Sequence, residues 1–169
     1  MRTSLALTSL ILALALALAG CGSVPPAPAG RISPATFQNE RDAAPAARDI
    51  TLYALMLLKT EYRFGGKNPD AGLDCSGLVS YVYREAAGMP LPANAASLAR
   101  TGREVAADRL RSGDLVLFNT LGRPFSHVGI YLGNGEFIHA PNSRGRVRVD
   151  KLTNRYWAQR FEMGRTLLD

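Results

Sequence analysis

The order of two hydrophobic periodicities constrains the fold of this chain more than any other feature. Apolar residues first recur at helical spacing, which predicts a helix over Pro45 to Lys59, a second ended by Gly88 and Pro90, and a short third over 93–100. From Gly113 the pattern changes to short β segments, which are DLVLF, HVGIYL, EFIHA, RVRV and RFEMGRTLL. Helices followed by a run of strands predict an α+β domain, with N-terminal helices packed on an antiparallel sheet.

The first 20 residues have the character of a bacterial lipoprotein signal peptide. Arg2 precedes an apolar run from Leu5 to Ala19, which is shorter than the roughly 20 residues that a transmembrane helix needs. The run ends in LAGC, Leu18 to Cys21, which resembles the lipobox at which a leader is cut before a lipid-bearing cysteine. An ordinary signal peptide with a coincidental cysteine is the alternative. We expect lipidated Cys21 to anchor the protein to a membrane, the outer membrane facing the periplasm if the host is Gram-negative.

Residues 21–46 are rich in Pro, Ala, Gly and Ser and are expected to form a flexible tether, which leaves 47–169 as one domain of ordinary size. The formal net charge is +6, and the basic residues are scattered. Because they form no stripe interleaved with aromatic residues, nucleic acid is not an expected partner. An anionic polymer of the cell envelope fits the charge, although a solvated basic surface explains it equally well.

Cys75 is the only cysteine left unmodified if Cys21 carries lipid, because the chain has two cysteines. In GLDCSGLV, Asp74 is a predicted N-cap that places Cys75 in the first turn of the second helix. Free N–H groups there favour a thiolate and can also hold an oxyanion. A buried cysteine that serves only as a small apolar side chain is the alternative.

A thiol nucleophile needs a base, and the chain has two histidines, His127 and His139. They flank a predicted hairpin whose turn is Gly133 to Gly135, with Leu132 opposite Glu136. On that register the two histidines lie diagonally on one face of the sheet, whereas a two-residue turn would separate them. His127 would then take the thiol proton while His139 orients it.

Zinc is a rival use of the same side chains. Cys75, His127 and His139, with Asp74 in reserve, supply atoms that zinc accepts. However, the sequence lacks the close ligand pairs, such as C-x2-C or H-x3-H, that usually nucleate such a site. We therefore expect no metal and no cofactor.

Four segments together resemble the NlpC/P60 cysteine peptidases in order and spacing: YRFGG, GLDCSGLV, LRSGDLVLF and SHVGIYLGNGEFIHAP. The resemblance extends from about Ile50 to Leu168. It implies a papain-like α+β fold, in which a helix bearing the cysteine packs on an antiparallel sheet bearing the histidines. The site residues that it implies are Cys75 as nucleophile, His127 as base, His139 as third polar residue, Tyr62 near the oxyanion, and Asp74 and Ser76 near the substrate groove.

The resemblance also implies a peptidoglycan hydrolase that cuts stem peptides, commonly between the γ-carboxyl of D-glutamate and a diamino acid. We expect a monomer, and an adaptor protein is one way in which such an enzyme could be restrained. Two alternatives stay open. One is a non-catalytic envelope module that binds murein or a partner protein, and the other is an amidase or acyltransferase on the same fold.

Overall fold

The computed structural model describes residues 45–141 and 145–168. The predictions for residues 1–44, which include the leader, lipidated Cys21 and most of the tether, lie outside the described residues. Within these ranges, no helix combines the length and the apolar character that crossing a membrane requires. The elements in chain order are α2 (Pro45–Met56), β1 (Lys67–Asn68), β2 (Gly72–Leu73), α3 (Cys75–Ala87), α4 (Ala95–Leu98), β3 (Arg103–Val105), a 3-10 turn (Ala107–Arg109), β4 (Leu115–Phe118), β5 (His127–Gly133), β6 (Glu136–His139), β7 (Arg148–Lys151), α5 (Arg155–Ala158) and β8 (Phe161–Thr166).

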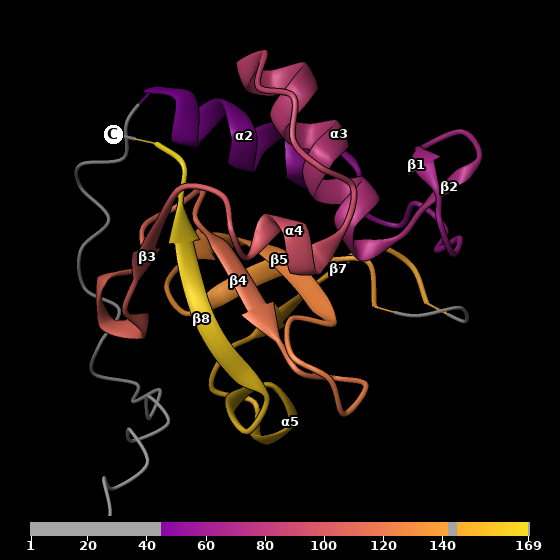
Figure 1. The fold of residues 1–169 in the computed structure, drawn as a ribbon. Coiled ribbons are helices and arrows are strands. Elements are labelled where there is room, and N and C mark those ends of the chain that lie inside the picture. Colours follow the sequence, from indigo (N-terminus) through magenta and orange to yellow (C-terminus); the bar gives the residue numbers. More distant parts are fainter. Residues whose placement is uncertain (1–44, 142–144, 169) are drawn as a thin grey trace, which may run out of the picture.

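The central element is a six-stranded antiparallel sheet in the order β3-β8-β4-β5-β6-β7. Helices α2 and α3 lie together over one side of it, while α5 lies at the opposite side (Figure 1). This arrangement confirms the predicted α+β class with N-terminal helices on an antiparallel sheet.

Both faces of the sheet are covered by apolar side chains, which explains why β4 is buried along its whole length. On the helix side, Leu117 and Ile130 pack with the apolar stripe of α3, including Leu78. The other face holds an aromatic cluster built around Phe118 and Trp157. Alternation along each strand sends successive side chains into these two clusters.

The start of α3 is set by a side-chain cap that the sequence predicted. Oδ1 of Asp74 accepts hydrogen bonds from the Gly77 N–H at 2.7 Å and the Ser76 hydroxyl at 2.9 Å. Its Oδ2 accepts the Gly65 N–H at 2.9 Å, so the same carboxyl ties the preceding loop to the helix. At the other end Gly88 adopts the left-handed conformation, with φ of 63°, that ends helices.

Gly77 permits a close approach between α3 and the loop before it. A Cβ at this position would lie 1.9 Å from the carbonyl oxygen of Gly66, a backbone atom that also accepts the Asp74 N–H at 3.1 Å. Any larger side chain must therefore push apart the helix and the loop that carries Tyr62.

We expect Gly77→Ala to lower the free energy of unfolding by about 2 kcal/mol, the usual cost of overpacking a well-packed contact. The sign is informative, because alanine at an unobstructed helical position would stabilise the protein. Urea titration of the variant measures the change, and Glu85→Ala on the same helix, where the side chain is 38% exposed, is the control. A Gly77→Ala protein as stable as the wild type would contradict the described contact.

Several short elements differ from the predictions. The first helix ends at Met56 and not at Lys59, because the chain turns there and Lys59 adopts a φ of 70°. The β1–β2 ribbon, β3 and α5 were not predicted at all. Elements of two to four residues are too short to display a hydrophobic period, so only tertiary contacts define them.

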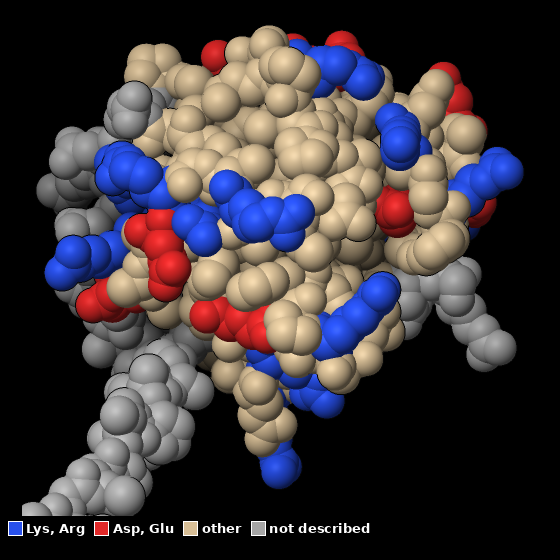
Figure 2. Space-filling model, viewed as in Figure 1, with Lys and Arg blue, Asp and Glu red and all other residues tan. Residues whose placement is uncertain are grey.

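Charged side chains are mixed on the face of the molecule that Figure 2 shows. Lysine and arginine side chains lie scattered there, with aspartate and glutamate between them and broad uncharged areas around both. This face carries no extended surface of one sign, as the scattered basic residues of the sequence suggested.

Candidate active site

The hairpin between β5 and β6 places the two histidines on one face, by a route that differs from the prediction. The turn has two residues, Asn134 and Gly135, both with positive φ, and Gly133 pairs with Glu136. The predicted pairing of Leu132 with Glu136 is therefore wrong. A bulge at Leu132 adds one residue to β5, and this restores the predicted register for the rest of the hairpin.

The histidines are in direct contact. Nε2 of His127 lies 2.9 Å from Nδ1 of His139, and both residues are buried, at 4% and 0% exposure. Burial, followed by the positive field of the neighbouring His139, lowers the pKa of His127 to about 3, and burial also lowers the pKa of His139. Both rings are therefore neutral near pH 7, and a neutral imidazole can accept a proton.

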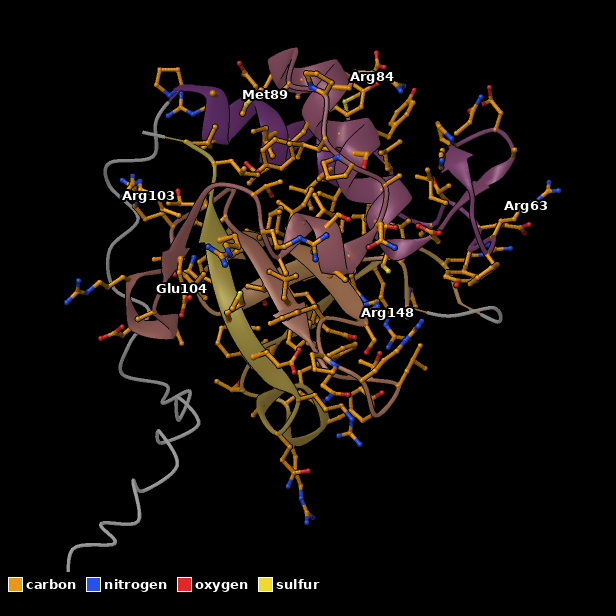
Figure 3. The ribbon with its side chains drawn as sticks, viewed as in Figure 1. Arg63, Arg84, Met89, Arg103, Glu104 and Arg148 are labelled. Atoms are coloured by element: carbon orange, nitrogen blue, oxygen red, sulfur yellow. The ribbon has the colours of Figure 1, made fainter. Side chains whose placement is uncertain are left out.

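Asp150 on β7 continues this chain of contacts. Its Oδ2 lies 2.9 Å from Nε2 of His139 and also accepts hydrogen bonds from Arg148 and from the indole N–H of Trp157, each at 3.0 Å. Burial alone would raise the pKa of Asp150, but the hydrogen bonds from His139 and Arg148 outweigh it and hold the pKa at about 2. Arg148, labelled in Figure 3, comes from the same strand.

Trp157 on α5 covers the imidazoles. Its ring stacks on that of His127, with centroids 5.3 Å apart, and meets the ring of His139 edge-on at 4.8 Å. The helix that carries it is short, and the side chain of Asn154 caps it by accepting the Tyr156 N–H. This aromatic cover, with the rings of Phe118 against His127 and Phe137 against His139, contributes to the burial of both histidines.

Cys75 occupies the first position of α3, as predicted, and its thiol lies at the backbone of Val128, the residue after His127. The predicted thiolate is not favoured in this environment. Burial and then the charge of Asp74 raise the pKa of Cys75 to about 11, despite hydrogen bonds from backbone groups that lower it. Near pH 7 the site therefore holds a neutral thiol and a neutral imidazole.

This raised pKa predicts how Cys75 reacts with iodoacetamide. Because only the thiolate is alkylated, we expect the rate to rise about tenfold for each pH unit between pH 7 and pH 10 and to level off near pH 11. Mass spectrometry of the Cys75 peptide measures the rate separately from any reaction at Cys21. A plateau already reached at pH 6 would instead indicate a thiolate–imidazolium pair.

The other predicted site residues lie around the start of α3. Burial raises the pKa of Tyr62, and the negative charges that Cys75 and Asp74 carry when ionised raise it further, which places the phenol near both groups. Ser76 is 5% exposed, and its hydroxyl donates a hydrogen bond to Asp74, so it contributes to the cap. In the loop that precedes α3, Arg63 extends away from the body of the protein (Figure 3).

A pocket of about 530 Å³ is lined in part by Asp150 and Trp157, the residues that contact the two histidines. Apolar, aromatic, polar and charged side chains all contribute to its wall, so it suits a ligand of mixed polarity. Its lining residues are Thr120, Leu121, Pro141, Arg148, Asp150, Asn154, Tyr156 and Trp157.

Sequence reasoning missed Asp150, Arg148 and Trp157. One signal was available, because Arg148 lies in the predicted strand RVRV and Asp150, two positions later, shares its face once the strand continues, as β7 does. The register that sets Arg148 opposite His139 was not available from the sequence. Among the residues that the structure describes, no group of three or more His, Cys, Asp or Glu side chains is arranged to hold a metal ion.

Comparison with known proteins agrees with this geometry. Residues 59–166 match the family model of the NlpC/P60 family. The murein DD-endopeptidase MepS/murein LD-carboxypeptidase of Escherichia coli K12 is 41% identical over 107 residues, which are 63% of this chain and 55% of that protein. The gamma-DL-glutamyl hydrolase of Bacillus subtilis is 40% identical over 122 residues, 70% of this chain and 29% of that protein.

The chain thus spans about half or less of the length of these two relatives. The probable endopeptidase NlpC of Escherichia coli K12 matches over 161 residues at 37% identity, which covers 94% of this chain and 97% of that protein. The crystal structure of the NlpC/p60 domain of the peptidoglycan hydrolase SagA superposes with a TM-score of 0.63 at 29% identity, covering 72% of this chain and 98% of that domain. By sequence, by fold and by its buried histidine pair, this chain belongs to the NlpC/P60 family of cysteine peptidases.

Proposed function

We propose that this protein is a peptidoglycan hydrolase that cuts stem peptides through an acyl-enzyme formed on Cys75. The observation that carries the proposal is the buried contact between His127 and His139, at 2.9 Å, beside the strand residue against which the thiol lies. A neutral imidazole held by a second one supplies the base and the orienting group that a cysteine hydrolase needs.

The proposed reaction depends on which ring nitrogen of His127 contacts His139. Since Nε2 of His127 contacts His139, Nδ1 is the nitrogen that accepts the thiol proton as the sulfur of Cys75 bonds to the peptide carbonyl carbon. Backbone N–H groups in the first turn of α3, with the phenol of Tyr62, stabilise the oxyanion. The imidazolium then protonates the leaving amine as the C–N bond breaks, and a water deprotonated by His127 hydrolyses the thioester.

The bond we propose joins the γ-carboxyl of D-glutamate to the diamino acid of the stem. The relative from Bacillus subtilis supports it, because that protein is named a gamma-DL-glutamyl hydrolase. MepS is named a DD-endopeptidase and LD-carboxypeptidase, so cross-links and stem ends are the alternative targets.

The cellular setting is also part of the proposal. The LAGC motif and the Pro- and Ala-rich segment after it support a lipid anchor at Cys21 and a tether that carries the enzyme to the wall. In a Gram-negative cell we propose the outer membrane, facing the periplasm. We propose a monomer, with an adaptor protein as one means of control.

Digestion of purified peptidoglycan tests the function and names the bond. The protein is incubated with intact sacculi and, separately, with uncrosslinked muropeptides, and the released fragments are weighed by mass spectrometry. Loss of everything beyond D-glutamate indicates the γ-glutamyl bond, separation of dimers indicates cross-link cleavage, and loss of a terminal D-alanine indicates carboxypeptidase activity. Protein alkylated at Cys75 is the control. Sedimentation with sacculi and no new fragments would favour the non-catalytic binding module.

A further inference from the structure

The end of the histidine pair distant from Cys75 is held by a single carboxylate oxygen. Oδ2 of Asp150 accepts four hydrogen bonds, at 2.9 Å from His139 and at 3.0 Å from two nitrogens of Arg148 and from Trp157. The groups of Arg148 and Trp157 can only donate. Oδ2 therefore carries no proton of its own and acts as an acceptor toward every neighbour.

This fixes the proton positions along the whole chain of contacts. Because Oδ2 only accepts, Nε2 of His139 must carry the proton of that ring, and its Nδ1 is left with a free lone pair. That lone pair lies 2.9 Å from Nε2 of His127, which must then be the protonated nitrogen of the second ring. Nδ1 of His127 is consequently unprotonated.

We propose that Asp150 is a positioning residue that, through His139, sets the tautomers of both histidines and leaves Nδ1 of His127 free to accept the proton of Cys75. The inference rests on the proposed function only for the role of that proton transfer. Asp150 acts through His139 and does not itself touch the reacting atoms.

Trp157 and the strand pairing support this role. The indole donates to Oδ2 while its ring covers both imidazoles, so one side chain fixes the carboxylate and shields the contacts from water. The β6–β7 register sets Phe137 opposite Asp150, two positions from His139, so the carboxylate reaches the ring diagonally. A purely structural pairing with Arg148 would not require contact with the histidine.

Nitrogen-15 NMR of the full chain, labelled at histidine, tests the proposal without any substrate. We expect both wild-type rings to carry their proton on Nε2. Asp150→Asn should keep these tautomers, since Arg148 and Trp157 hold an amide oxygen in the same place. Asp150→Ala removes the acceptor and should yield mixed tautomers in both rings. Glu136→Gln, at the other end of β6, should leave the nitrogen-15 signals of both histidine rings as they are in the wild type.

Kinetics on peptidoglycan supply the second readout. We expect Asp150→Ala to lower kcat about 10- to 100-fold with little change in KM, whereas Asp150→Asn stays within about fivefold of the wild type. A wild-type proton on Nδ1 of His127, or an Asp150→Ala protein with wild-type tautomers and wild-type kcat, would overturn the proposal. If Asp150→Ala does not fold, the other two proteins still test the proposal. A proton on Nδ1 of His127 in the wild type or in Asp150→Asn would overturn it. If peptidoglycan is not the substrate, digestion fails for the wild type while the NMR result stands.

Discussion

Cys75→Ala is expected to abolish peptidoglycan cleavage, lowering kcat by at least about 10⁴-fold. Alanine has no group that can form the thioester, and water attacking directly gains only from the oxyanion donors and from binding. The side chain lies at the first position of α3, where alanine keeps the helix and the Asp74 cap intact. Fragment release from sacculi over hours, followed by mass spectrometry, measures the loss.

Cys75→Ser is the matched variant, because it replaces only the sulfur of the thiol by an oxygen. It should also be inactive, since a serine hydroxyl is far less acidic than a thiol and His127 is a weak base with a pKa of about 3. A Tm for both variants equal to that of the wild type would show that the fold is retained. Full cleavage by Cys75→Ala would exclude the proposed nucleophile and the acyl-enzyme with it.

His127→Ala is expected to lower kcat about 10³-fold, which lies within the range that general acid–base catalysis supplies. The resting thiol is protonated, with a pKa of about 11, so the reaction depends on a base that removes its proton during attack. Without the imidazole, the thiolate forms only at alkaline pH. We therefore expect the residual activity of the variant to rise with pH between 7 and 10, where the wild type is nearly flat.

Two further variants separate loss of the base from loss of packing. His127→Gln keeps most of the volume that Trp157 covers, and it should be as inactive as His127→Ala. His139→Ala should lose less, about 10- to 100-fold, because it orients the base and does not take the proton. Retention of cleavage by His127→Gln, or a greater loss in the His139 variant than in the His127 variants, would reverse these assignments.

Local features of the site were predictable because the determinants lie close together in the chain. Asp74 as N-cap, Cys75 in the first turn and Gly88 as the end of α3 all follow from side-chain chemistry within one helix. The face shared by His127 and His139 was also predicted, although the turn that achieves it was not. A bulge at Leu132 compensates for the shorter turn, and no residue pattern in the hairpin predicted this bulge.

The sign of the thiol pKa could not be read from the sequence. A helix N-terminus lowers the pKa of a cysteine, and this effect depends only on position in the helix. Burial and the charge of Asp74 act in the opposite direction. Their combined effect is larger, and it raises the pKa of Cys75 to about 11. Burial is a property of everything packed around the thiol, so it exists only once the helix and the sheet have come together.

The sequence by itself determined the α+β class, the two principal helices, the strands of the hairpin and the family of the protein. Tertiary structure alone decided how the base is held. Asp150 reaches His139 through the register of β6 and β7, and Trp157 arrives from a four-residue helix with no periodic signal. The physical reason is that a hydrogen bond between distant strands depends on pairing and on the packing of both sheet faces, and neither is a local property of the chain.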